Sequence, residues 1–333
     1  MMQPNSSPPI VSTFVLKIRP LLLLAVVLGL GAFAIAQTTA AASGSEPQHT
    51  PEAGQKTFPS ANAAMEALYT AVKSGDTDAL IEIFGPGGKE LVLSGDQVQD
   101  KNGRQTFVDR YDQMHRLVPD SEHSDTLVIG AENWPMPIPI VEANGAWFFD
   151  TASGKQEILY RRIGKNELAA IETCHVLVEA QTEYGSEPRD GSSKNLYAAK
   201  FISDPGKQNG LYWKAGDNDA SPIGPLIADA AAQGYKGAEA KNSPYQGYFF
   251  RILTRQGAAA SGGAQDYMVQ GRLERGFAFV AYPAEYRNSG VMTFIVDKDG
   301  VVYQKDLGPN TASVAKAMTT YNPNKTWKQV ESQ

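Results

Sequence analysis

The sequence predicts an α+β fold in which helices and a small antiparallel sheet come first, followed by a long helix packed on a C-terminal antiparallel sheet. Two observations predict this order. Apolar residues recur at helical spacing over residues 61–117 and again over residues 154–185. Later in the chain, each of these segments is followed by short runs of β-branched and aromatic residues with turn sequences between them. Runs of helices followed by runs of strands are the pattern of α+β domains.

Residues 1–36 have the features of a cleavable secretory signal peptide. Lys17 and Arg19 are the only charged residues in this segment, and Leu21–Ala36 is an apolar run of 16 residues that ends in small side chains. The run is shorter than the ~20 apolar residues that span a bilayer as a helix. We therefore expect cleavage before Gln37 rather than a retained membrane anchor.

The composition favours a protein that acts in the periplasm or outside the cell. The formal net charge of −6 becomes more negative by two when the leader is removed, and the basic residues are scattered, so nucleic acid is not an expected partner. No later segment approaches membrane-spanning length, so we expect no stable membrane insertion after cleavage. The single cysteine, Cys174, rules out an internal disulfide, and its apolar helical surroundings favour a buried thiol over a disulfide-linked homodimer. The sequence leaves the oligomeric state open.

Three regions follow the leader. Residues 37–57 are rich in Ala, Ser, Thr, Gly and Pro, which predicts a flexible linker. Residues 58–155 are expected to form an N-terminal α+β domain, and residues 156–333 a C-terminal α+β domain. The chain is long enough for two domains of ordinary size.

The N-terminal domain is expected to begin with three helices, over residues 61–74, 77–84 and 103–117. Ser60 and Asp76 are good N-caps for the first two helices, and Gly75 is a good stop for the first. Two strands are expected next, over residues 125–131 and 146–151, with Asn144-Gly145 as a hairpin turn. Residues 135–142 contain three prolines, which lack a ladder donor and confine this segment to a sheet edge or an irregular stretch.

The C-terminal domain is predicted to begin with a long helix over residues 154–185, with a break at Gly164 and with Asn166 as the cap of its second half. Residues 186–243 are polar, with one helix expected over residues 225–233. The apolar face of the long helix is predicted to hold Leu168, Ile171, Val178 and either Cys174 or His175. Strands are expected over residues 247–254, 276–282, 291–296 and 301–305, and a terminal helix over residues 311–321.

Five stretches of the chain carry a family resemblance, namely Ala63–Pro86, Asn133–Asp150, Arg161–Glu172, Tyr248–Gly257 and Ala281–Gly308. Over these stretches, and over nearly the whole chain after the leader, the sequence resembles the bacterial exported family filed as domain of unknown function 2950. The resemblance implies export in a Gram-negative bacterium and assigns no activity.

A second resemblance concerns the order of elements from Asn166 onward. It is similar to the globular part of type IV pilins and pseudopilins, in which a long helix is followed by a variable loop and an antiparallel sheet. Gly247–Phe250 and Gly290–Tyr303 look like the sheet strands of that group. The resemblance implies a pilin-like fold for the C-terminal domain. It does not imply a filament, because a pilin helix begins as an apolar segment directly after a short leader, whereas Arg161 and Lys165 precede this helix deep inside the chain.

The candidate ligand-binding residues are aromatic and basic. Trp134 and Trp213 lie in segments predicted to be irregular, so we expect both to be exposed, and Tyr212 adjoins Trp213. Together with the adjacent pair Arg161 and Arg162, these aromatic residues are the candidates for lining a groove that takes a sugar or a peptide.

No cofactor is expected, apart from calcium at one acidic loop. Asp217 and Asp219 supply carboxylate oxygens within a loop, which are the ligands that calcium prefers. The four histidines lack the spacing of a zinc site, and the chain has neither a Gly-x-Ser-x-Gly sequence nor a complete phosphate-binding loop.

These observations favour a non-enzymatic binding or structural module in the periplasm, with an envelope protein or a surface polymer as its partner. Two alternatives stay open. One is an envelope polymer hydrolase that uses Asp and Glu, since the separation of two carboxylates is set by the folded structure. The other is an accessory protein of a pilus or a secretion system.

Overall fold

The computed structural model describes residues 49–214, 220–235 and 243–331. The predicted signal peptide (residues 1–36) and part of the predicted linker therefore lie outside the described residues. Contacts join the described residues into one compact unit. Within the described ranges, no helix is both long enough and apolar enough to cross a membrane.

The helices predicted at the start of the chain are confirmed with their expected bounds. The Ser60 hydroxyl accepts a hydrogen bond from the amide of Ala63, and Gly75 takes a left-handed conformation with φ at 71°. The Asp76 carboxylate caps the next helix in the same way. The elements of this segment are α1 (Ala61–Ser74), α2 (Thr77–Phe84), the 3₁₀ turn η1 (Pro86–Gly88) and α3 (Lys89–Val92).

The third predicted helix is displaced along the sequence. Helix α4 spans Gln97–Gln113 rather than residues 103–117. It begins earlier because the Asp96 carboxylate accepts hydrogen bonds from two amides of the first turn. Gly103, the predicted start, lies in the helix interior. The helix ends earlier because residues 115–121 pair as a strand.

The first sheet is antiparallel, with strand order β1-β2-β4-β5 and with β3 paired to β2. The turn between β4 and β5 is confirmed, since Asn144 and Gly145 both have positive φ, at 54° and 78°. This is the conformation that a two-residue type I′ hairpin requires. The strands are β1 (His115–Ser121), β2 (Ser124–Ile129), β3 (Trp134–Pro135), β4 (Ile140–Ala143) and β5 (Ala146–Phe149).

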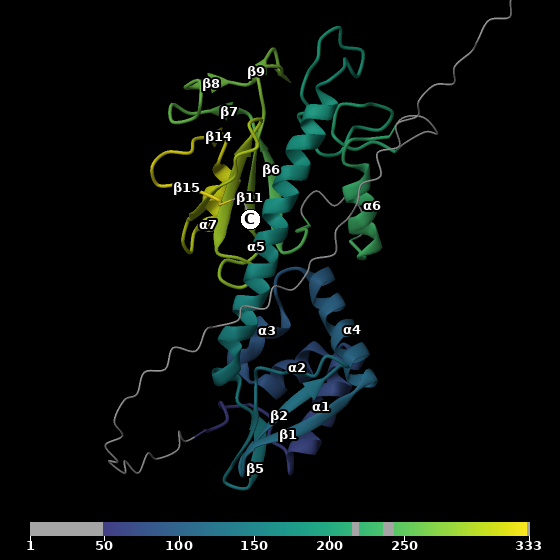
Figure 1. Cartoon of the computed structure of the whole chain (residues 1–333), viewed down its shortest axis with the longest axis vertical. Helices are drawn as coiled ribbons and strands as arrows, with labels where there is room; N and C mark the ends of the chain where they lie inside the picture. Colours follow the sequence, from purple (N-terminus) through teal and green to yellow (C-terminus); the bar gives the residue numbers. More distant parts are fainter. Residues whose placement is uncertain (1–48, 215–219, 236–242, 332–333) are drawn as a thin grey trace, which may run out of the picture. The chain divides into compact units, whose positions relative to one another are not determined.

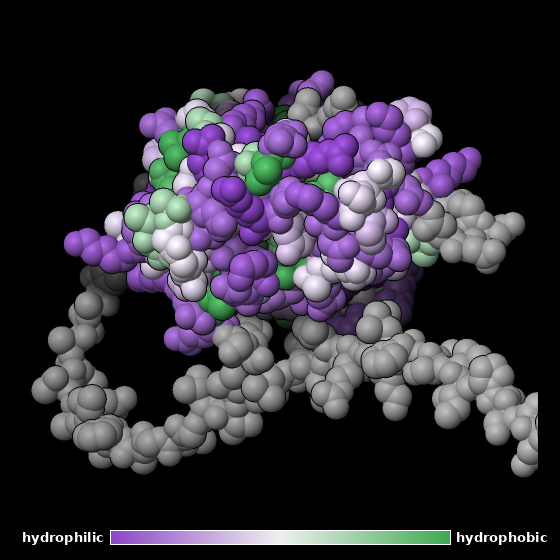
Figure 2. Space-filling view, turned by 90° about the horizontal axis from the view of Figure 1, so that it is seen from above, coloured by the Kyte–Doolittle hydropathy of each residue, from purple (hydrophilic) through white to green (hydrophobic). Residues whose placement is uncertain are grey.

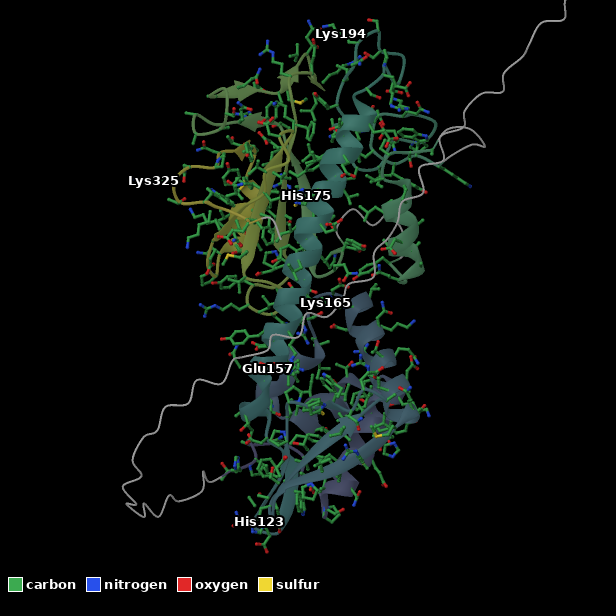
Figure 3. The ribbon with its side chains drawn as sticks, in the orientation of Figure 1. His123, Glu157, Lys165, His175, Lys194 and Lys325 are labelled. Atoms are coloured by element: carbon green, nitrogen blue, oxygen red, sulfur yellow. The ribbon has the colours of Figure 1, made fainter. Side chains whose placement is uncertain are left out.

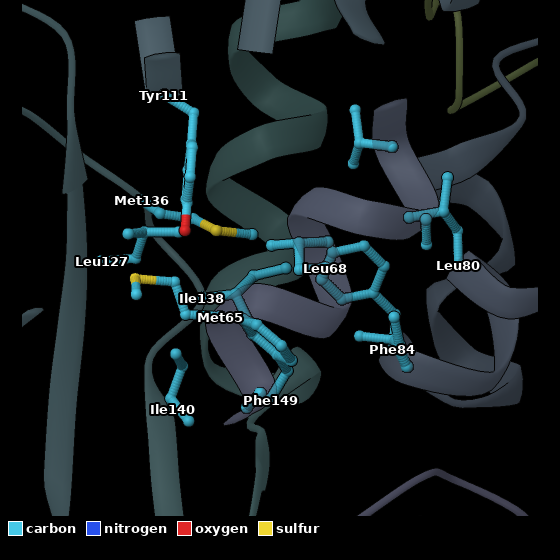
Figure 4. Close-up of a cluster of buried hydrophobic side chains, with 14 of the residues drawn as sticks. Met65, Leu68, Leu80, Phe84, Tyr111, Leu127, Met136, Ile138, Ile140 and Phe149 are labelled. Atoms are coloured by element: carbon cyan, nitrogen blue, oxygen red, sulfur yellow. The ribbon is translucent and has the colours of Figure 1, made fainter. Parts of the chain in front are cut away.

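Helices α1, α2 and α4 pack with this sheet around one apolar core (Figure 4). Leu68 of α1, Phe84 of α2 and Phe149 of β5 are buried in it. The rings of Phe84 and Phe149 meet edge to face, with their centroids 5.4 Å apart. Burying a side chain of this size stabilises the fold by about 1.5–3 kcal/mol.

Helix α5 (Thr151–Tyr184) is continuous over 34 residues, so the predicted break at Gly164 and the predicted capping role of Asn166 are wrong. A glycine inside a helix costs about 1 kcal/mol relative to alanine, and packing on both sides of Gly164 outweighs this cost. Asn166 is fully buried, and its amide donates a hydrogen bond to the carbonyl of Ser289. The helix also runs across residues 155 and 156, where the domain boundary was expected, and that boundary stays a prediction.

The apolar face of α5 differs in part from the expected one. Cys174 is fully buried and Val178 packs beside it, whereas His175 is exposed. Leu168 is 51% exposed, so its predicted place on this face is wrong. At ~100° per residue, Leu168 lies on the opposite side of the helix from the buried Ala170.

The C-terminal sheet is antiparallel, with strand order β15-β13-β12-β11-β6, and α5 packs across β11 and β12 (Figure 1). Strand β11 is buried along its whole length. Its Phe279 side chain packs on the α5 side, whereas Val280 packs on the other side with Ala315 of α7. The elements are β6 (Tyr248–Leu253), β11 (Ala278–Pro283), β12 (Met292–Asp297), β13 (Tyr303–Asp306), β15 (Lys328–Gln329) and α7 (Thr311–Ala317).

The remaining elements are short. Helix α6 (Gly224–Ala232) confirms the helix predicted in the polar region. The predicted terminal helix ends early, at Ala317, because Thr320 and Tyr321 pair as a parallel strand with β7. The short strands are β7 (Arg255–Gln256), β8 (Gln265–Asp266), β9 (Met268–Val269), β10 (Arg272–Leu273) and β14 (Thr320–Tyr321). On the face drawn in Figure 2, hydrophobic residues form small separate spots among hydrophilic ones.

The Cys174 thiol is expected not to react with Ellman's reagent while the protein is folded. It is fully buried, and burial raises its pKa to about 12, whereas a reactive thiol is exposed and ionised. The measurement is the release of thionitrobenzoate in mildly alkaline buffer, with and without guanidinium chloride. Reaction should require the denaturant. Rapid reaction in buffer alone, or a disulfide-linked dimer on a non-reducing gel, would contradict the buried position.

Candidate functional site

A cavity of about 560 Å³ lies between α4 and α5. Side chains from α1, α2, β3 and the segment after α6 complete its walls. This volume is within the range of ~300–1,000 Å³ that is usual for small-molecule sites in proteins.

The floor of the cavity is apolar. Leu68, Phe84 and Met136 belong to the first hydrophobic core and also line the cavity, and Figure 4 shows them converging from α1, α2 and the segment after β3. The half-buried rings of Phe107 and Trp134 extend this apolar surface. The accessible apolar surface of the cavity therefore comes from half-buried side chains such as Phe107 and Trp134, and the buried Leu68, Phe84 and Met136 lie beneath it.

The rim of the cavity is basic. Four cationic side chains line it, one from α4 (Arg104) and three from α5 (Arg161, Arg162 and Lys165). Among the described lining residues, Asp100 is the single carboxylate. The described side chains of the rim thus carry a net positive charge, whether or not Asp100 is ionised.

Arg161 and Lys165 are neighbours on α5, one helical turn apart. Both side chains are exposed. The Nε of Arg161 donates a hydrogen bond to Glu157 Oε1 at 2.7 Å, which is an ion pair within the helix. Figure 3 shows Lys165 between Glu157 and His175 along α5.

Arg162 is built into the wall of the cavity. Its guanidinium donates hydrogen bonds to the carbonyl oxygens of Glu90 and Leu91, both at 2.7 Å, and to the amide oxygen of Asn288. Burial lowers the pKa of Arg162, and the nearby Asp100 opposes this effect. The guanidinium stays charged, because arginine loses its proton only far above neutral pH.

The Asp100 carboxylate accepts hydrogen bonds from the amide of Ser94 at both oxygens, at 3.1 and 3.2 Å. Burial raises the pKa of Asp100, and this effect outweighs the opposing hydrogen bond from Ser94 and the positive charges of Arg162 and Arg104. A fall in pH therefore makes the cavity more positive, because Asp100 gains its proton at a higher pH than an exposed aspartate does.

Buried and part-buried hydrogen bonds fix the spacing of the walls. The side-chain amide of Gln99 in α4 donates to Asn166 Oδ1 in α5 at 2.6 Å, and Asn166 donates in turn to the carbonyl of Ser289 at 2.9 Å. The Tyr235 hydroxyl, which follows α6, donates to Asp96 Oδ2 at 2.8 Å. These bonds join segments that are far apart in the sequence, so the cavity is preformed.

The structure brings three of the five predicted ligand-binding residues to this cavity. Trp134, Arg161 and Arg162 line it, whereas Tyr212 and Trp213 do not. The sequence did not predict the contributions of Arg104 and Lys165. The four-residue spacing of Arg161 and Lys165 was the available signal for Lys165, and nothing in the sequence places Arg104 beside α5.

The expectation that Trp213 is exposed is wrong. Only 7% of this residue is exposed. The Arg189 guanidinium lies 5.1 Å from the centre of its ring, and the ring of Tyr184 meets it edge-on at 6.4 Å. The adjacent residue is held by its main chain, since the amide of Tyr212 donates to the carbonyl of Phe201 at 2.8 Å. These contacts cover a ring that was expected to be exposed because its segment was predicted to be irregular.

Metal-binding side chains do not converge in the part of the chain that the structure describes. No group of three His, Cys, Asp or Glu residues is placed there to hold a metal ion. The candidate calcium ligands Asp217 and Asp219 lie outside the described residues, so the calcium site stays a prediction. His49 instead lies beside one carboxylate, with its Nδ1 2.6 Å from Asp150 Oδ2.

Comparison with known proteins identifies the family. A family profile with the description "Protein of unknown function (DUF2950)" matches residues 55–330, which include every residue that lines the cavity. No curated protein and no solved structure matches the chain. The pilin-like resemblance of the C-terminal domain therefore stays a prediction. Because the profile spans most of the sequence, the chain belongs to the DUF2950 family of proteins of unknown function.

Proposed function

We propose that this DUF2950 member is an exported, non-enzymatic binding module of the cell envelope, and that the cavity between α4 and α5 is its binding site. The observation that carries the proposal is the convergence of Trp134, Arg161 and Arg162 on one cavity of about 560 Å³. In this proposal the leader of residues 1–36 directs the chain to the periplasm. The partner is an envelope protein or a surface polymer that presents a group to the cavity.

The lining favours binding over hydrolysis. Enzymes that hydrolyse glycosides generally use two carboxyl groups, one on each side of the bond that breaks. Asp100 is the single carboxylate among the described lining residues, and both of its oxygens already accept a hydrogen bond from Ser94. A preformed cavity with an apolar floor and a few polar groups at its rim is the common form of a binding pocket.

A variant that fills the cavity tests the proposal. Gly103 lines the cavity, and a Cβ atom at this position would meet no atom within 4 Å. The first side-chain atom of Gly103→Leu would therefore meet no clash, and we expect the rest of the side chain to reduce the free volume of the binding site. Gly164 offers a matched control, since it too is an exposed helical glycine with no atom near its Cβ position, and it does not line the cavity.

The experiment compares what each chain retains from an envelope extract. Wild type, Gly103→Leu and Gly164→Leu are immobilised, and the eluted molecules are identified by mass spectrometry. We expect wild type and Gly164→Leu to retain the same envelope component and Gly103→Leu to lose it. Retention that is equal for all three chains would contradict the cavity as the binding site. Turnover of a glycan or peptide substrate by wild type but not by Asp100→Asn would contradict the non-enzymatic function.

A further inference from the structure

We infer that the ligand of this cavity is an amphipathic anion, a molecule with an apolar ring or hydrocarbon body and one acidic group. The inference rests on the proposed function, and it adds the chemical class of the ligand. The acidic group would lie at the rim formed by α4 and α5. The apolar body would lie on the floor formed by the first core.

The charge of the rim selects an anion. The side chains of Arg104 and Lys165 line the cavity and form no hydrogen bond or salt bridge with the side chains of the other described residues, although Arg104 attracts Asp100 through space, so both are available to a ligand. Arg162 adds a positive charge that is fixed in the wall by its hydrogen bonds to two carbonyl oxygens. In a partly buried site such charges are less screened by water than they are on an open surface. An acidic group therefore gains from the rim, and a cationic group is repelled.

The floor selects an apolar body. The half-buried rings of Phe107 and Trp134 line the cavity and present apolar surface to it, above the buried core. A wholly polar anion, such as inorganic phosphate, would leave this surface covered only by water. A body that displaces the water gains about 25 cal/mol for each Å² of apolar surface that it covers.

A pair of matched dyes separates the acidic group from the apolar body. Anilinonaphthalene sulfonate and N-phenylnaphthylamine share the same ring system, and only the first carries an anionic sulfonate. Both fluoresce more strongly in apolar surroundings, so titration of the protein gives a dissociation constant for each dye. We expect the anionic dye to bind more tightly than the neutral one, and we expect this difference to shrink as salt is added.

Charge variants place the acidic group at the rim. The double variant Arg104→Gln with Lys165→Gln is expected to weaken binding of the anionic dye about tenfold and to leave the neutral dye unchanged. Lys101→Gln is the control, because Lys101 is exposed on α4 and does not line the cavity. It should leave the affinity for both dyes unchanged. An equal effect of the control and the double variant on the anionic dye would overturn the inference.

Displacement of the anionic dye distinguishes aromatic from aliphatic sources of the ligand. Naphthoate and decanoate are compared with naphthalenemethanol and decanol, which have similar bodies without the acid. Displacement by either acid, with no displacement by its alcohol at the same concentration, supports the inference and identifies the type of body. If an alcohol displaces the dye as effectively as the matching acid does, the inference is overturned.

Failure of the ligand class and failure of the binding site give different results. If both dyes bind wild type equally and Gly103→Leu abolishes both, the cavity binds ligands but not anions in particular. In that case the inference falls and the proposed function stands. If wild type binds neither dye, or if Gly103→Leu leaves both affinities unchanged, the cavity does not bind this class of molecule and the inference is contradicted. The proposed function is then decided by the envelope-extract experiment, in which equal retention by wild type, Gly103→Leu and Gly164→Leu contradicts it.

Discussion

Replacing Gly154 with alanine is expected to lower the free energy of unfolding by about 1–3 kcal/mol, although alanine is the better helix former. Gly154 is buried in the first turns of α5. A Cβ atom at this position would lie 2.2 Å from the carbonyl oxygen of Pro137 and 2.7 Å from the Cα of Ile138. These are backbone atoms, so they cannot rotate away as the end of a flexible side chain can. The helix and the extended segment would have to move apart.

The control for this prediction lies in the same helix. Gly164→Ala places a Cβ where no atom lies within 4 Å, so it should raise the free energy of unfolding by about 0.5–1 kcal/mol through helix propensity alone. Urea denaturation followed by circular dichroism measures both variants against wild type. A stabilising effect of Gly154→Ala, or effects of the same sign for both variants, would show that the close approach of α5 to Pro137 is absent.

Replacing Asp96 with alanine is expected to lower the free energy of unfolding by about 3 kcal/mol or more. Asp96 is buried, and its carboxylate accepts four hydrogen bonds. Two come from amides in the first turn of α4, and loss of such a cap costs about 0.5–2 kcal/mol. The other two come from the Tyr235 hydroxyl and the buried amide of Gly247. Leaving a buried donor such as this amide without a partner costs a further ~1–3 kcal/mol.

Asp96→Asn separates the two roles of this carboxylate. Asparagine caps helices as well as aspartate does. Its single side-chain oxygen cannot serve both the α4 amides and the Gly247 amide, so an intermediate loss is expected. The measurement is again urea denaturation, with the change in the midpoint at constant slope read as the change in stability. A loss for Asp96→Ala no greater than that of an ordinary exposed cap would contradict the link between α4 and β6.

Local signals in the sequence predicted local structure well. Ser60, Gly75 and Asp76 bound α1 and α2 as expected, because a cap or a stop depends on residues within one helical turn. The Asn144-Gly145 hairpin was predictable for the same reason. Each of these features is decided by neighbours in the chain, so the pattern is present in the sequence itself.

Errors occurred where distant segments compete with local propensity. Gly164 has a low helix propensity. Two residues later, however, the side chain of Asn166 donates a hydrogen bond to the carbonyl of Ser289, and this tertiary contact helps to keep α5 continuous. Trp213 lies in a segment predicted to be irregular and therefore exposed, yet Arg189 and Tyr184 cover it. No pattern within a short window predicts partners so far away.

The sequence by itself determined the family, the α+β class, the two apolar segments that become α1 and α5, and the acidic balance of the chain. The secretory leader stays a prediction from residues 1–36. Only the tertiary structure decided the cavity. Its cations come from α4 and α5, its floor from the first core and its remaining wall from the segment after α6. These groups are separated by long stretches of chain. They become neighbours only when packing, together with hydrogen bonds such as those of the buried residues Asn166 and Asp96, places the helices side by side.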